Sequence, residues 1–194
     1  MVTYDAKTAL VVTDVQNDFA DPAGSLYVPD GERVVAAANG EIERATAAGA
    51  LVVYTQDWHP PSTPHFLKDG GVWPVHCVRD TQGAAFHPLL LVQGPIVRKG
   101  MGGEDGYSGF SVRDPLSGEA TATSLEGQLR ERGVERVVVV GLATDYCVQA
   151  TALDAVHKGF ATVVLRDAVR GVNLQPGADE RALDAIAGEG VLVE

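Results

Sequence analysis

RVVVVGLATDYCV, residues 136–148, contains the sharpest change of pattern in the chain. Its valine run predicts a buried strand over residues 136–141, and a helix is expected to begin near Asp145 and to end at Gly159. Thr144 has a side chain suited to the N-cap of that helix. A buried strand that leads directly into a helix is typical of a parallel sheet with helical crossovers.

The same alternation of apolar strands and amphipathic helices extends over the rest of the chain. Further strands are predicted at residues 9–15, 51–56, 94–98 and 161–165, with a short edge strand at 191–193. Helices are predicted at about residues 32–48, 123–132 and 179–187. Thr123 and Glu126 give the second of these helices a capping-box pattern. We therefore predict a three-layer α/β/α sandwich around a mostly parallel sheet of about six strands, a Rossmann-like architecture.

The length and composition of the chain favour a single domain over residues 1–194. Of the 194 residues, 45% are hydrophobic, which is enough for one core. The segment at about residues 57–95 departs from the pattern, because it is rich in Pro, Gly, His and Trp and lacks periodicity. An irregular stretch of this length in a compact domain is usually functional, so we expect an insertion that carries active-site or metal-binding residues.

The formal net charge of −11 argues against nucleic acid or an anionic membrane surface as a partner. No apolar run is long enough to span a bilayer, and the N-terminus lacks a basic segment followed by an apolar one. We therefore expect a cytoplasmic protein with a small-molecule ligand. Two cysteines, Cys77 and Cys147, cannot form a disulfide framework, so each is a packing residue, a ligand or a nucleophile.

Side chains with reactive groups follow the predicted strands at their carboxyl ends. They are Asp14, Asp57, His59, Lys99 and Cys147. In an open parallel sheet these ends meet at one edge, where ligands bind. We therefore expect the five side chains to converge.

Cys147 is predicted to lie in the first turn of its helix, where free N–H groups and the dipole stabilise a thiolate or an oxyanion. Because free cysteine is often buried, this segment alone is equally compatible with a structural role. Asp14 could accept the thiol proton and pass it to a leaving amine, and Lys99 could stabilise the thiolate. Taken singly, Asp14 also suits a turn and Lys99 a solvated loop. The coincidence of all three at strand ends favours a nucleophilic site.

A second group of ligand-type side chains lies in the irregular segment. Asp57 and His59 are two residues apart and point to the same side of an extended chain, and His65 and His76 follow. One carboxylate and three imidazoles suit a divalent ion such as zinc, iron or manganese. The alternative is that these histidines cap turns or fill surface loops, but their clustering beside an aspartate favours a metal. The remaining candidates are expected to be structural: Cys77, His87 and His157.

The chain resembles the nicotinamidase/pyrazinamidase branch of the isochorismatase-like cysteine hydrolases. The resemblance is carried, in the family's order, by VVTDVQNDF (11–19), DWHP (57–60), WPVHC (73–77), the pair Lys99 and Gly100, YSGF (107–110) and GLATDYCV (141–148). These motifs span most of the chain, and DWHP together with WPVHC is specific to this branch. Residues 101–106 are glycine-rich and slightly longer than in mycobacterial-type pyrazinamidases, which affects the rim of the pocket.

The resemblance implies an isochorismatase-like hydrolase fold and the hydrolysis of nicotinamide, and of pyrazinamide, through a cysteine thioester, in NAD salvage. It implies a divalent metal that binds the pyridine nitrogen, no organic cofactor, and either a monomer or a homodimer. It implies a catalytic triad of Asp14, Lys99 and Cys147, and the metal ligands Asp57, His59, His76 and, as a fourth, His65. It implies a substrate pocket of Phe19, Trp73 and Tyr107. It also implies an oxyanion hole formed by the N–H groups of Ala143 and Cys147, beside a cis peptide between Leu142 and Ala143.

Three other functions compete with this interpretation. A metal-free hydrolase of isochorismate, an aliphatic amide or a ureide would not need four ligand-type residues in one segment. A non-catalytic ligand-binding protein would not need Cys147, Asp14 and Lys99 together. A metal-dependent hydrolase in which Cys147 is structural would stay active after the thiol is alkylated.

Overall fold

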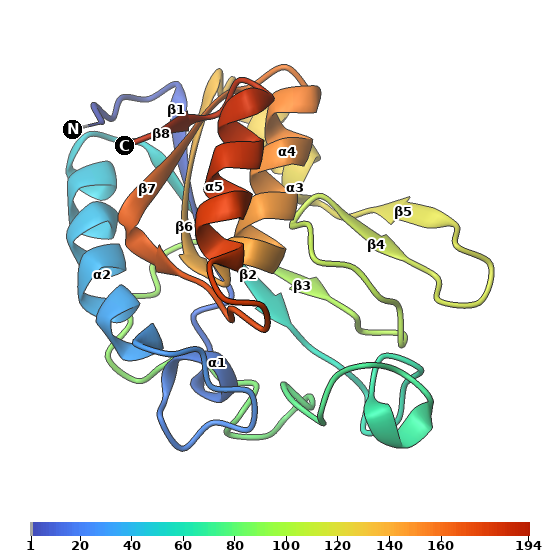
Figure 1. The fold of residues 1–194 in the computed structure, drawn as a ribbon. Coiled ribbons are helices and arrows are strands. Elements are labelled where there is room, and N and C mark those ends of the chain that lie inside the picture. Colours follow the sequence, from blue (N-terminus) through green and yellow to red (C-terminus); the bar gives the residue numbers. More distant parts are fainter. Residues whose placement is uncertain (1) are drawn as a thin grey trace.

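The computed structural model describes residues 2–194, and six of its strands form one parallel sheet (Figure 1). The strand order is β3-β2-β1-β6-β7-β8. The chain fills one half of the sheet from β1 outwards and then returns to fill the other half from β6. Ligands bind at such a switch point, beyond the carboxyl ends of the two central strands. The strands are β1 (Thr8–Thr13), β2 (Leu51–Asp57), β3 (Ile96–Lys99), β6 (Arg136–Leu142), β7 (Ala161–Arg170) and β8 (Leu192–Val193).

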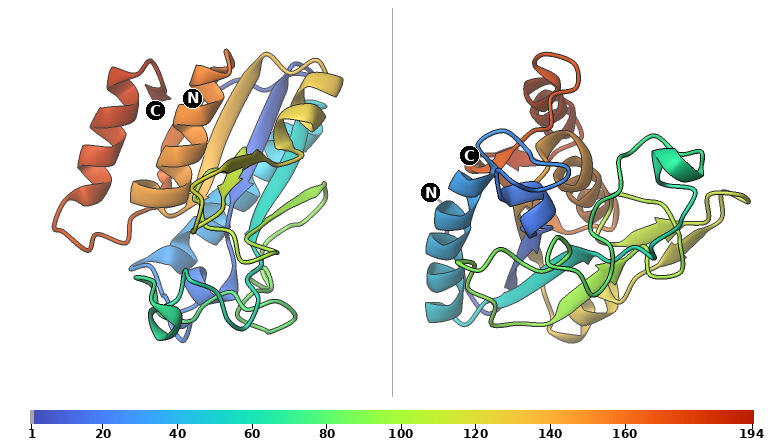
Figure 2. Two further views of the ribbon diagram at one scale, coloured as in Figure 1. Left: turned by 90° about the vertical axis from the view of Figure 1, so that its right-hand side faces the viewer. Right: turned by 90° about the horizontal axis from the view of Figure 1, so that it is seen from below.

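Helices cover both faces of the sheet, because alternate residues of the central strands point to opposite sides. In β1, Leu10 and Val12 belong to the core beneath α2, whereas Ala9 and Val11 belong to the core beneath the other helices. Figure 2 shows the resulting three layers, which confirm the predicted sandwich. Among the described helices, none is long and apolar enough to cross a membrane. The helices are α2 (Gly31–Ala47) on one face and α3 (Leu125–Glu131), α4 (Gln149–His157) and α5 (Ala178–Gly188) on the other.

The capping box predicted at the start of α3 does not form. The helix begins at Leu125, and Thr123 Oγ1 instead donates to Gly109 O at 2.6 Å. Glu126 accepts a hydrogen bond from Lys158 Nζ at 2.7 Å. The prediction was wrong because Thr123 Oγ1 accepts from Leu125 N–H at 3.2 Å and not from Glu126 N–H. The backbone N–H of Thr123 donates to Phe110 O and not to the Glu126 side chain.

Three features of the fold have no counterpart in the predicted pattern. A short antiparallel hairpin of β4 (Ser111–Arg113) and β5 (Ala120–Ala122) projects beside the sheet (Figure 1), and none of its residues is buried. β7 continues well beyond the predicted 161–165, through a stretch that contains Arg166 and Asp167. A single-turn helix, α1 (Asn17–Ala20), follows β1.

The long segment between β2 and β3 contains one short 3₁₀ helix, η1 (Leu67–Asp69), and lies along the carboxyl edge of the sheet (Figure 1). Gln16 binds the last residue of β2 and the backbone of Ala84 within this segment. Its Nε2 donates to Asp57 O and to Ala84 O, both at 2.8 Å, and its Oε1 accepts from Asp57 N–H at 2.8 Å. Gln16 is fully buried, so the backbone groups of Asp57 depend on it for these hydrogen bonds, whereas Ala84 O also accepts from Gln56 Nε2 at 2.9 Å.

Replacing Gln16 with alanine is expected to lower the free energy of unfolding by about 2–3 kcal/mol, because the buried backbone N–H and C=O of Asp57 lose their side-chain partner. Urea denaturation measures the loss. The matched control is Gln82→Ala, in the same segment but with an exposed side chain, which should change the stability by less than about 0.5 kcal/mol. Equal effects of the two substitutions would contradict the role of Gln16.

Candidate active site

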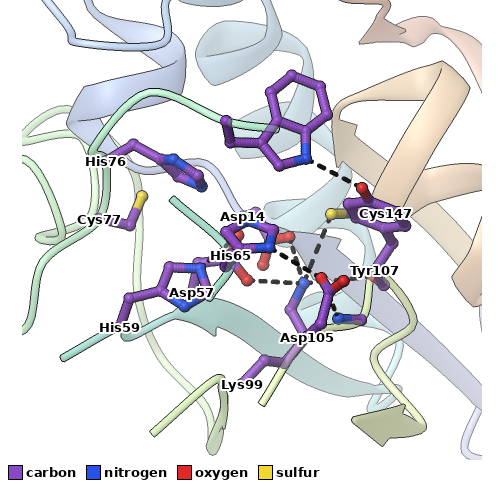
Figure 3. Close-up of polar contacts among 12 residues, drawn as sticks. Asp14, Asp57, His59, His65, His76, Cys77, Lys99, Asp105, Tyr107 and Cys147 are labelled. Carbon is purple, nitrogen blue, oxygen red and sulfur yellow. Dashed lines mark hydrogen bonds and ion pairs between the residues drawn. The ribbon is translucent and has the colours of Figure 1, made fainter. Parts of the chain in front are cut away.

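Asp14, Asp57, Lys99 and Cys147 meet at the carboxyl edge of the sheet, where each was expected (Figure 3). Asp14 directly follows β1, Asp57 and Lys99 are the last residues of β2 and β3, and Cys147 follows β6. All four are buried. Because these strands are neighbours in the sheet, the four side chains form one continuous row across its edge.

Lys99 connects the row. Its Nζ donates to Asp14 Oδ2 at 2.8 Å, forms an ion pair with Asp57 Oδ1 at 2.9 Å, and donates to Cys147 Sγ at 3.5 Å. Burial alone would lower the pKa of Lys99, but the negative charges of Asp14 and Asp57 outweigh it and raise the pKa. Lys99 is therefore a charged ammonium group at neutral pH.

The surroundings of Cys147 raise the pKa of its thiol, which is opposite to the effect expected from its place at a helix start. Burial raises its pKa, and the nearby carboxylates of Asp14 and Asp57 add to that effect, which Lys99 opposes only in part. The pKa of Asp14 is also raised, first by burial and then by Asp57, against the pull of Lys99 and Thr55. A buried carboxyl group with a raised pKa beside a thiol suits the exchange of a proton between them.

The turn that carries Cys147 differs from the predicted helix start. Residues Thr144–Val148 form a π-helical turn, and the N-cap position belongs to Ala143, so the assignment of Thr144 as the N-cap was wrong. The peptide bond Leu142-Ala143 is cis, as the resemblance implied. Gly141 precedes it with a φ of 115°, and a Cβ at Gly141 would collide with the backbone of Thr13. Only glycine allows this close approach of β6 to β1.

The imidazoles of His59, His65 and His76 form a second centre beside the first. One ring nitrogen from each lies within 4.8 Å of the others, and all three side chains are buried. Among residues 2–194, neither ring nitrogen of His59 has a hydrogen-bond partner. Burial lowers the pKa of His76 to about 4, so it is neutral at physiological pH and has a lone pair to offer. Buried, unpartnered imidazole nitrogens facing one another fit a divalent metal ion.

Asp57 stands between the two centres. Its Oδ1 pairs with Lys99, and its Oδ2 lies 3.8 Å from His59 Nε2. Burial alone would raise its pKa, but Lys99 and His59 outweigh that effect and lower it. Asp57 is therefore a carboxylate with one oxygen turned towards the histidines, and it completes the predicted ligand set.

An aromatic pocket opens onto both centres. Trp73 Nε1 donates to the hydroxyl of Tyr107 at 3.0 Å, and both rings pack edge-on against Tyr146, with centroids 4.9 and 5.2 Å away. Phe19 lies against His76 at 5.4 Å. The lining includes all of the predicted pocket residues together with Tyr146: Phe19, Asp57, His65, Trp73, His76, Tyr107, Ala143, Tyr146 and Cys147.

Two residues of the site have no counterpart in the sequence analysis. Tyr146 directly precedes Cys147, and Asp105 accepts a hydrogen bond from His65 Nδ1 at 2.8 Å. The only signal for Asp105 was its place in the glycine-rich stretch after Lys99.

The residues expected to be structural lie outside both centres: Cys77 is fully buried, His157 pairs with Glu189 at the surface, and His87 accepts from Leu89 N–H.

Residues 8–193 match the isochorismatase domain, and the chain therefore belongs to the isochorismatase family. Within that family it is similar to nicotinamidases and pyrazinamidases. It is 39% identical to the nicotinamidase of Escherichia coli, over 87% of this chain and 85% of the relative. The pyrazinamidase of Pyrococcus horikoshii, solved in complex with zinc, is 41% identical and has a TM-score of 0.85, over 97% of this chain and 98% of that one. PnC1 from L. infantum, solved with nicotinate, is 35% identical and has a TM-score of 0.88, over 100% and 95% of the two chains.

Replacing Lys99 with methionine is expected to lower the free energy of unfolding at pH 7 by about 3–5 kcal/mol, since it leaves the buried carboxylates of Asp14 and Asp57 without their cation. The control Lys158→Met removes a half-buried ion pair with Glu126 and should cost about 1 kcal/mol or less.

The loss caused by Lys99→Met should shrink as the pH falls towards 4. Lys99 holds the pKa of Asp57 below its usual range, so the stability that Asp57 adds to the wild type is present above about pH 4 and is lost below it. Without Lys99, burial raises the same pKa, and protonation relieves the repulsion. Urea denaturation of the chelator-treated proteins at pH 7 and at pH 4.5 measures both values. A loss that stays constant with pH would contradict this account.

Proposed function

We propose that the protein hydrolyses nicotinamide to nicotinate and ammonia through a thioester on Cys147. The observation that carries the proposal is the buried row of Asp14, Lys99 and Cys147, of which Cys147 lines an aromatic pocket, with the histidine cluster beside it. The similarity to the E. coli nicotinamidase and to a structure solved with nicotinate supports this substrate.

In the first half-reaction, Asp14 takes the proton from Cys147, and the thiolate attacks the carboxamide carbon. Lys99 stabilises the thiolate through its contact with Sγ and stays protonated throughout. The N–H groups of Ala143 and Cys147 stabilise the tetrahedral oxyanion. Asp14 then gives its proton to the leaving nitrogen, so that ammonia departs and the nicotinoyl thioester remains.

In the second half-reaction, Asp14 takes a proton from water, and the resulting hydroxide attacks the thioester carbon. Collapse of the second tetrahedral intermediate breaks the C–S bond, releases nicotinic acid and returns the proton to Sγ. The raised pKa of Asp14 matches a group that must gain and lose a proton in both halves. One amide and one water are consumed, and one acid and one ammonia are formed.

The residues that would hold the metal are His59, His65 and His76, together with Asp57. The ligand set suits zinc, iron and manganese alike, and a zinc complex of a related pyrazinamidase supports it. When bound, the ion supplies a Lewis-acidic position for the ring nitrogen of the substrate. The protein itself contributes neutral imidazoles and one carboxylate, which Lys99 keeps ionised.

The pocket suits a flat, neutral heteroaromatic amide. Phe19, Trp73 and Tyr107 offer aromatic faces and edges to the ring, and pyrazinamide has the same shape and also carries ring nitrogens. We infer that both amides are substrates. The place in NAD salvage, the cytoplasmic location, the oligomeric state and the single-domain organisation stay predictions.

The first test measures ammonia release from nicotinamide by the wild type and by Cys147→Ala. The variant is expected to lose at least about 10³-fold in kcat, because removing a nucleophile removes the covalent route. The control Cys77→Ala removes the other thiol, which lies outside the pocket, and should keep most of the activity. If the metal-replete wild type releases no ammonia, the proposed substrate is wrong. If activity survives alkylation of Cys147, the proposed nucleophile is wrong.

A second test removes the metal. Dialysis against a chelator should abolish nicotinamide turnover, and added zinc, iron(II) or manganese(II) should restore it, because the ring would otherwise lack its anchor. A metal-free hydrolase would keep its activity after chelation. Metal content measured on the same samples links the loss of turnover to the loss of the ion.

A further inference from the structure

Asp105 lies in the loop between β3 and β4, and its Oδ1 is 2.8 Å from His65 Nδ1 (Figure 3). An ionised carboxylate only accepts hydrogen bonds, so Nδ1 of His65 must carry the hydrogen. The other ring nitrogen, Nε2, is then left with its lone pair. His76 is arranged in the same way, because its Nδ1 contacts the carbonyl oxygen of Pro74 at 2.7 Å.

The three imidazoles differ in the charge of these outer partners. His76 has a neutral carbonyl, and His59 has no hydrogen-bond partner among residues 2–194. Within that range, His65 alone is hydrogen-bonded to a carboxylate. A carboxylate on the far nitrogen of a ligand histidine fixes the tautomer and makes the imidazole a stronger donor to a metal.

The carboxylate of Asp105 is itself held in place. The N–H of Gly106 donates to the same Oδ1 at 2.8 Å. The backbone of Asp105 exchanges two hydrogen bonds with Arg113, the last residue of β4, at 2.7 and 2.5 Å. The side chain of Asp105 is 26% exposed, so it is partly shielded from water.

A second contact joins the same two segments. Thr63 Oγ1 donates to Gly103 O at 3.0 Å and accepts from His65 N–H at 3.3 Å. The loop that carries Asp105 is therefore tied both to the backbone and to the ring of His65. A ligand held from two sides is already oriented before any ion arrives.

We propose that Asp105 is a positioning residue for the metal centre, which fixes the His65 imidazole with Nε2 available to the ion and increases the affinity of the site for a divalent metal. This inference rests on the ligand set of the proposed function, and it goes beyond it in assigning a role to a residue outside that set. It also gives the glycine-rich loop after Lys99 a function in metal binding.

The test compares two isosteric substitutions in one loop, Asp105→Asn and Glu104→Gln. Each removes one negative charge, but the Glu104 carboxylate accepts a hydrogen bond from Gly102 N–H instead of a histidine. Metal-stripped proteins are titrated with zinc in competition with a chromogenic chelator, without any amide present. Asp105→Asn should weaken zinc binding by about 10–100-fold, and Glu104→Gln by less than about threefold, as expected for an exposed charge. Asp105→Ala, which removes the hydrogen bond as well, should weaken it further.

Two further measurements separate positioning from a general structural effect. The visible spectrum of the cobalt(II)-loaded protein should change in Asp105→Asn and stay unchanged in Glu104→Gln. In a His65→Ala background, Asp105→Asn should cause no further loss of zinc affinity, because its effect passes through His65.

Equal affinities of Asp105→Asn and Glu104→Gln would overturn the proposal, and so would an undiminished effect of Asp105→Asn in the His65→Ala background. A wild type that binds no zinc would also overturn it, while leaving cysteine-dependent turnover to be measured separately. Conversely, a protein that binds zinc as expected but does not hydrolyse nicotinamide would disprove the proposed substrate and keep the role of Asp105.

Discussion

A buried ammonium group keeps its proton only when negative groups surround it, and this requirement organises the active edge of the sheet. Lys99 on β3 reaches past Asp57 on β2 to Asp14 after β1, and then to Cys147 after β6. Neighbouring strands are about 4.8 Å apart, so a long side chain is needed to join groups from several of them. The same charge that balances the carboxylates also lies against the thiol, which makes fold stability and thiol chemistry depend on one interaction. Asp57 extends the arrangement to the histidines.

The main elements of the fold follow from local sequence, and the exceptions have local causes. Valine-rich runs mark β1, β2 and β6 because both faces of a central parallel strand are buried. The hairpin of β4 and β5 buries no residue, so no apolar period reveals it. β7 extends into Arg166 and Asp167, which are exposed and which hide its continuation. The start of α3 was misplaced because Thr123 and Glu126 bind groups that the sequence does not show to be near.

The residues of the candidate site could be predicted where they follow a strand or belong to a family motif. Their positions at the ends of predicted strands were enough to predict that Asp14, Asp57, Lys99 and Cys147 lie close together. They could not give the pKa shift of the thiol, because that depends on burial and on the balance of one cation against two carboxylates. Nor could they identify Asp105, since a carboxylate forty residues from its histidine partner leaves no pattern in the sequence.

The two residues after Gln16 add further hydrogen bonds to the segment between β2 and β3. Asn17 Nδ2 donates to Gln82 O, and Asp18 Oδ2 accepts from Cys77 N–H. The segment that carries the three histidines is thus fastened at several points to the short turn that directly follows Asp14. Local opening in proteins proceeds in cooperative units defined by such hydrogen bonds. The histidine cluster and the proton-transfer carboxyl group therefore belong to one unit of local unfolding. We therefore expect heat to disrupt the histidine cluster and the row of Asp14, Lys99 and Cys147 together, with neither part lost before the other.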